Sequence, residues 1–186
     1  MNLILCDANP EMRAAWSLAF KDIENVSVET EWPTAYQIDV LVVPGTVNGF
    51  LDRGVGLACS LFFGWDLQRR TKMEMLAHDE LGRCKIGKAV LVRTMDERMP
   101  YCAYAPIVED YKTNKSDGVA FKAFKAALLS IRYSNFFGKG RFNTILAPAM
   151  EGFYGADNPM ECARQMARAW VEVFHPIRLT PNPEKS

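Results

Sequence analysis

The sequence predicts a single domain of three layers, in which helices cover both faces of a β-sheet. Segments with the two-residue period of strands alternate with segments of helical period from one end of the chain to the other. Val40–Val43 is a continuous apolar run, which is typical of a strand covered on both faces. The length of 186 residues suits one domain, and we find neither an internal repeat nor an interdomain linker. Together these observations favour an α/β/α fold.

The first half of the chain supplies three predicted strands and two predicted helical regions. The strands are expected over residues 3–6, 26–28 and 40–43. A helix is expected from about Pro10 to Phe20, and Asp7 is predicted to cap its start. A second helical pattern begins at Leu57 and leads to a polar helix from Asp66 to about His78, which is either a continuation of the first or a separate helix.

The second half repeats this alternation. Strands are expected over residues 89–92, 101–104 and 144–147. A long helix is predicted over 118–136, and another begins at Asn158-Pro159, because Asn can accept from free N–H groups and Pro has no N–H to leave unpaired. We therefore expect a domain over residues 1–175, followed by an extended, proline-bearing tail over 176–186.

The composition argues against several classes of function. The 22 basic and 22 acidic residues balance, which disfavours broad capture of nucleic acid through its phosphates. The five cysteines and two histidines show no metal-ligand spacing, so neither a metal nor a cofactor is expected. No apolar run approaches the roughly 20 residues that span a bilayer. An odd number of separated cysteines without a signal peptide predicts a cytoplasmic protein that does not contact a membrane.

Two glycine-bearing loops are the predicted ligand site. The first loop, Pro44–Gly56, contains four glycines, and the second loop, Pro148–Gly155, contains two. Each follows a predicted strand and precedes a helix, which is where open α/β sheets place their ligands. Glycines let N–H groups approach an anion, and a helix N-terminus adds a favourable dipole. Spacing alone leaves an equal alternative, that each loop is only a turn.

Four motifs lie in order at Asp39–Ala58, Gly82–Val90, Ile145–Gly155 and Met160–Met166. In this order they resemble the motifs of the macrodomain family. Asp39–Ala58 is similar to that family's first phosphate loop, and Gly82–Val90 is similar to its G-x-x-x-V-G-x-A-V motif. Ile145–Gly155 resembles the second phosphate loop, shortened by one residue, and Met160–Met166 resembles the closing helix. The resemblance covers about residues 3–173. It implies a macrodomain-like α/β/α fold with a mixed central sheet, and a site for ADP-ribose.

Three positions depart from the family pattern. The asparagine that contacts the distal ribose corresponds to Thr46, although Asn48 lies two residues further on. An aspartate that is catalytic in one hydrolase branch corresponds to Gly56, while Asp52 matches a different position. The acidic residue that reads the adenine amine corresponds to Trp32. These departures imply that binding can persist while hydrolytic chemistry is lost.

The resemblance and the loops together define the predicted site. The candidate catalytic residues are Asn48 and Asp52. The predicted ligand-binding residues are Gly45, Thr46, Gly49, Gly54, Val55, Glu31, Trp32, Glu151, Gly152, Phe153, Tyr154 and Gly155. Of the two loop aromatics, one is expected to face the ligand and one the core, and for Trp32 stacking on adenine and plain packing are equal alternatives.

Three functions follow as hypotheses. The first is binding of ADP-ribose or a related nucleotide, free or attached to an ADP-ribosylated macromolecule. The second is an enzyme that removes ADP-ribose from a macromolecule or an acyl ester. The third is a domain that senses or sequesters a signalling nucleotide.

Overall fold

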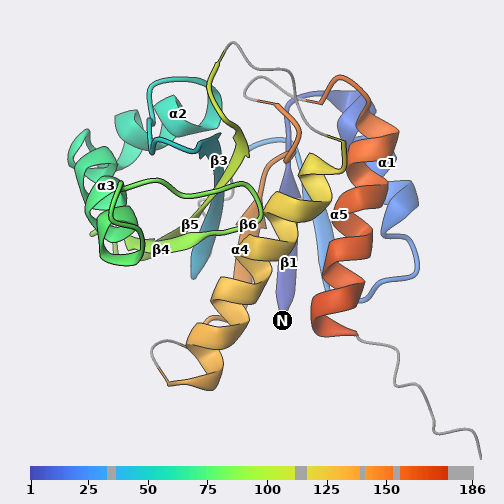
Figure 1. Cartoon of the computed structure of the whole chain (residues 1–186). Coiled ribbons are helices and arrows are strands. Elements are labelled where there is room, and N and C mark those ends of the chain that lie inside the picture. The colour runs from blue at the N-terminus through green and yellow to red at the C-terminus, as the bar shows by residue number, and fades with distance from the viewer. Residues whose placement is uncertain (33–36, 112–116, 139–140, 153–155, 176–186) are drawn as a thin grey trace, which may run out of the picture.

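The computed structural model describes residues 1–32, 37–111, 117–138, 141–152 and 156–175 (Figure 1). The strands in these ranges are β1 (Asn2–Cys6), β2 (Val26–Glu29), β3 (Val40–Thr46), β4 (Val90–Arg93), β5 (Tyr101–Val108) and β6 (Thr144–Ala147). The helices are α1 (Pro10–Ala19), α2 (Gly54–Phe63), α3 (Asp66–His78), α4 (Val119–Phe136) and α5 (Pro159–Phe174).

The strands form one mixed sheet in the order β2-β1-β6-β3-β5-β4. Every neighbouring pair is parallel except β4 and β5, which run antiparallel. The last strand in sequence therefore lies between β1 and β3. The predicted α/β/α fold with a mixed central sheet is confirmed.

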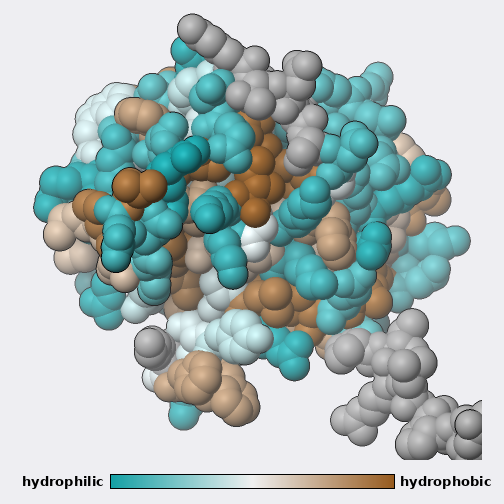
Figure 2. Space-filling view, in the orientation of Figure 1, coloured by the Kyte–Doolittle hydropathy of each residue, from teal (hydrophilic) through white to brown (hydrophobic). Residues whose placement is uncertain are grey.

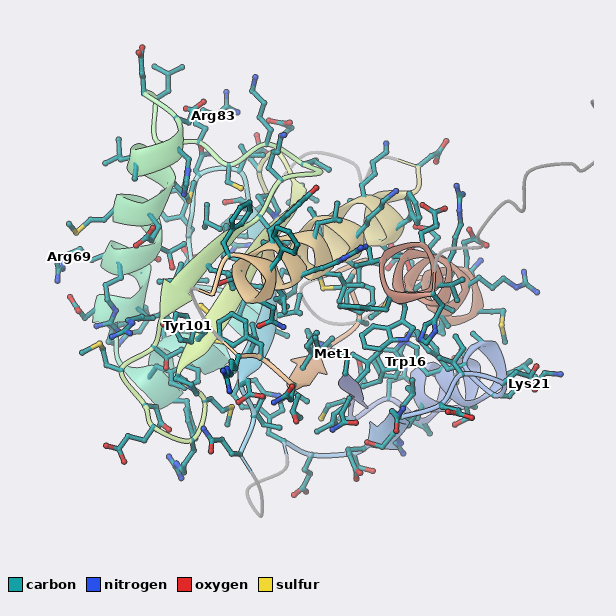
Figure 3. The ribbon with its side chains drawn as sticks, turned by 90° about the horizontal axis from the view of Figure 1, so that it is seen from below. Met1, Trp16, Lys21, Arg69, Arg83 and Tyr101 are labelled. Atoms are coloured by element: carbon teal, nitrogen blue, oxygen red, sulfur yellow. The ribbon has the colours of Figure 1, made fainter. Side chains whose placement is uncertain are left out.

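Both faces of the sheet are buried, which explains the continuous apolar strands. Leu3 and Leu5 contribute to a core with α1, α4 and α5, whereas Ile4 and Cys6 contribute to a second core with α2 and α3. Successive side chains of a strand point to opposite faces, so each strand serves both cores. Figure 3 shows α3 on one side of the strands and α4 and α5 on the other.

The parallel strands end at the same edge of the sheet, where the ligand loops were predicted. β6 pairs with β3 through Val40–Ile145 and Leu41–Leu146, so the first and second loops leave neighbouring strands in the same direction. The segment after β5 leaves at this edge too, because β5 pairs with β3 in parallel. A register shift at Gly45 and Thr46 marks the point where β3 turns into the first loop.

The helix boundaries decide one open alternative and correct one prediction. The pattern from Leu57 to His78 forms two helices, because Gly64 takes φ 90° and ends α2. Asn9, and not Asp7, is the N-cap of α1: its side chain accepts from the Glu11 N–H at 2.9 Å. Asp7 instead accepts from the backbone N–H of Asn9 at 2.8 Å.

The start of α5 is as predicted. The Asn158 side chain accepts from the Glu161 N–H at 3.1 Å, and Pro159 follows it. All five cysteines are buried, as small core residues are. In the described ranges, no helix has the length and apolar character needed to cross a membrane. The predicted tail, 176–186, lies outside the described residues.

Thirteen large apolar residues are exposed in the described part of the chain. Figure 2 shows hydrophobic groups gathered at the lower end of α4, where Phe136 and Phe137 are exposed and pack edge to face on each other.

Candidate functional site

The start of the first loop is fixed from beneath by Tyr104. A Cβ atom at Gly45 would lie 2.0 Å from the Tyr104 hydroxyl oxygen, so only glycine admits this ring. The hydroxyl donates to the Thr46 carbonyl at 2.6 Å. Burial raises the pKa of Tyr104 above its usual value, so the hydroxyl remains a donor. Gly45 thus has a packing role, and ligand contact at this position stays a prediction.

Gly49 shapes the middle of the loop. Its φ of 74° lies in the left-handed region, and an added Cβ would approach the Met75 sulfur to 2.7 Å. Its N–H donates to the Thr46 carbonyl at 3.3 Å. The backbone of the first loop therefore packs directly on α3.

Thr46 carries an unpaired hydroxyl. The residue is 1% exposed, and its Oγ1 has no hydrogen-bond partner among the residues that the structure describes. A buried polar atom without a partner costs about 1–3 kcal/mol. Such an atom at a predicted binding position is a candidate contact for a ligand hydroxyl.

Asp52 and Asn48 are both exposed, and Asp52 is held by a neighbour. Its carboxylate accepts a hydrogen bond from the Tyr111 hydroxyl, and the Arg53 guanidinium lies 4.3 Å from the centre of the Tyr111 ring. Tyr111 was not among the predicted site residues. The signal that points to it is its position just after β5, at the same edge of the sheet.

Among the described residues, no side chain caps the N-terminus of α2. Arg53 occupies the cap position without a side-chain capping hydrogen bond, and the first turn contains no acidic residue. The first N–H groups of a helix have no partner within the helix, and they carry partial positive charge. Gly54 begins the helix with φ 50°, and half-buried Val55 packs against the second core. This terminus suits an anion.

Packing explains why position 56 holds glycine. A Cβ at Gly56 would lie 3.1 Å from the Leu51 Cα. Leu51 is itself fixed, because its N–H donates to Gln68 at 2.8 Å and its carbonyl accepts from Ser60 at 2.7 Å. A carboxylate-bearing side chain at position 56 would require the loop to shift.

The second loop is described in part. Gly152 is buried, and Glu151 is half-buried with its carboxylate 3.5 Å from the Asn158 backbone N–H, which donates to it. The predicted site residues Phe153, Tyr154 and Gly155 lie outside the described residues.

Glu31 and Trp32 follow β2. Glu31 is exposed, and half-buried Trp32 packs edge to face on Phe62 of α2, with ring centres 5.9 Å apart. This contact favours the packing interpretation of Trp32, while its partial exposure leaves surface for a ligand.

No protein-family model matches the sequence, and no curated protein matches it either. Two solved structures share its fold. The macrodomain of Mycobacterium tuberculosis DarG aligns with a TM-score of 0.61 and 14% identity, over 77% of this chain and 88% of that one. The macrodomain of Thermus aquaticus DarG aligns with a TM-score of 0.56 and 16% identity, over 73% and 83%. The chain therefore has a macrodomain-like fold.

Proposed function

We propose that this protein binds ADP-ribose, or a closely related nucleotide, at the edge of the sheet where the two loops emerge. The proposal rests on the resemblance of both loops to macrodomain phosphate loops. The observation that carries it is the N-terminus of α2, which has no side-chain cap and lies at the end of the first loop, within a macrodomain-like fold.

The ligand can be oriented from the chemistry of the site. Its diphosphate would accept from the first N–H groups of α2, around Gly54, where the helix dipole favours an anion. The distal ribose would lie near Thr46 and supply a partner for the unpaired hydroxyl. The base would extend toward Glu31 and Trp32, which lie after β2.

Isothermal titration with ADP-ribose, ADP and AMP tests this proposal. The proposal is refuted if the folded protein binds none of the three at millimolar concentration. Gly152→Val should abolish binding and leave the fold intact, because a branched side chain would enter the diphosphate site. Ala14→Val, on the exposed face of α1, is a control that introduces the same side chain and should bind like the original protein.

A second candidate function, removal of ADP-ribose from a modified substrate, is favoured by the Asp52–Tyr111 hydrogen bond. In this reaction water would attack the anomeric carbon of the distal ribose, and the bond to the modified group would break. Asp52 or Asn48 would position the water, and Asp52 would accept its proton. Position 56 cannot take this role without movement of Leu51.

Release of free ADP-ribose from a modified substrate distinguishes this reaction from binding alone. If Asp52→Ala and Asn48→Ala both keep the original rate, neither residue has the proposed role. Mass spectrometry of nucleotide carried through purification would separate both activities from sequestration of a different nucleotide.

A further inference from the structure

A pocket separate from the two loops lies behind the first loop, between the end of α3 and the start of β4. It has a volume of about 410 Å³, within the range of small-molecule sites. Its lining comes from the last turn of α3, the following segment up to Ala89, and Val90 of β4. None of these residues belongs to the first or second loop.

The floor of the pocket is apolar. Met75, Cys84 and Val90 line it and are buried, and half-buried Ala89 lies beside them. Burial raises the pKa of the Cys84 thiol to about 11, so this group stays uncharged near neutral pH. The floor therefore suits an apolar part of a ligand.

The rim of the pocket carries cationic side chains. Lys85 and Lys88 are exposed, and in the described ranges neither forms an ion pair. A turn brings them together, because the Lys88 N–H donates to the Lys85 carbonyl at 2.9 Å and Gly87 takes φ 87°. Positions one and four of such a turn lie close in space.

Other charges at the rim partly offset one another. Arg83, whose position near the end of α3 is marked in Figure 3, forms an ion pair with Glu109 at 2.9 Å. The Asp79 carboxylate accepts from the N–H groups of Leu81 and Arg83 at 3.0 and 3.2 Å. The His78 side chain also lines the pocket. The two lysines thus outnumber the single rim carboxylate, Asp79.

We propose that this pocket binds a small organic anion, with a phosphate or carboxylate group at Lys85 and Lys88 and an apolar body on the floor. This ligand would be bound independently of the nucleotide proposed for the two loops. The apolar floor and the cationic rim are both needed, since an inorganic anion would leave the floor uncovered and a neutral molecule would leave the lysines unpaired.

The test is a titration followed in ¹H–¹⁵N NMR spectra, with phenyl phosphate, benzoate, benzyl alcohol and inorganic phosphate as probes. We expect saturable shifts in the amides of residues 84–90 with phenyl phosphate or benzoate. Binding should be at least tenfold weaker with benzyl alcohol and with inorganic phosphate. The tighter of the two anions identifies the head group as phosphate or carboxylate.

The Lys85→Gln/Lys88→Gln double variant should weaken the tighter probe at least tenfold. The control is Lys21→Gln/Arg141→Gln, which removes the same charge from exposed positions outside the pocket and should leave binding unchanged. The proposal is overturned if shifts appear only in the two loops, if benzyl alcohol binds as well as the anions, or if the Lys85/Lys88 variant binds normally. Because the amides of the loops and of residues 84–90 are read separately, failure here does not bear on nucleotide binding at the loops.

Discussion

Replacing Thr46 by valine separates a structural role of this residue from a role in binding. Valine has nearly the shape of threonine but lacks the hydroxyl. In the free protein that hydroxyl is buried without a partner among the described residues, so its removal breaks no hydrogen bond. We therefore expect the free energy of unfolding to stay constant or to rise, by at most about 1–3 kcal/mol.

The same substitution should weaken ligand binding. If the distal ribose hydrogen-bonds to Thr46, valine leaves a ligand hydroxyl unpaired, at a cost of about 1–2 kcal/mol. The dissociation constant for ADP-ribose should then rise roughly five- to thirtyfold. Urea denaturation measures the first effect, and isothermal titration measures the second.

Thr71→Val is the matched control for this experiment. Thr71 is equally buried, but its hydroxyl donates to the Leu67 carbonyl at 2.9 Å. Its loss should destabilise the protein by about 0.5–1.5 kcal/mol and leave affinity unchanged. If Thr46→Val is destabilising by more than 1 kcal/mol, the hydroxyl has a partner in the free protein. If affinity for ADP-ribose does not change, the ligand does not contact Thr46.

Three further predictions concern the loop backbone, the base and the thiols. Gly49→Ala should destabilise the protein more than Gly118→Ala. Both glycines have a left-handed φ, which costs alanine about 1–2 kcal/mol, but at Gly49 the added Cβ would also collide with Met75, whereas nothing lies within 4 Å at Gly118. Equal losses of unfolding free energy in urea denaturation would refute the packing argument. The dissociation constants of ADP-ribose and its inosine and guanosine analogues should lie within about tenfold of one another, or about 1.4 kcal/mol, since an indole stacks on any base. Trp32→Ala should weaken binding of all three. A hundredfold preference for adenine that Glu31→Gln removes would identify Glu31 as the reader of the base. The free energy of unfolding should fall as pH rises from about 9 toward 11, since the folded protein keeps the Cys84 proton after the unfolded chain has lost it. In Cys84→Ala the free energy of unfolding should fall less steeply with pH, by up to about 1.4 kcal/mol per pH unit. The same steepness in both proteins would contradict the raised pKa.

The sheet could be predicted from sequence because its strands are buried on both faces. The run at 40–43 is apolar at every position, and such a run has few other places in a folded domain. The start of α5 was equally predictable, because Asn158 and Pro159 act through local chemistry that needs no distant partner.

Features that depend on tertiary contacts could not be predicted. The role of Gly45 depends on Tyr104, which is 59 positions away in the chain and reaches it only through the pairing of β3 with β5. The hydrogen bond of Tyr111 to Asp52 likewise joins two loops. The break at Gly64 stayed open in the sequence because a glycine within a helical pattern is compatible with either a continuous or an interrupted helix.

The central position of β6 has a consequence for synthesis of the chain. Without β6, the hydrogen-bonded strands divide into the pair β2–β1 and the set β3–β5–β4, and no pairing joins them. While residues 144–147 are still in the ribosome, the described strand pairs that a nascent chain can form leave the facing edges of β1 and β3 unpaired. Exposed edges of this kind can pair with other chains. Until the last strand inserts between them, the growing protein is most vulnerable to aggregation at these two edges.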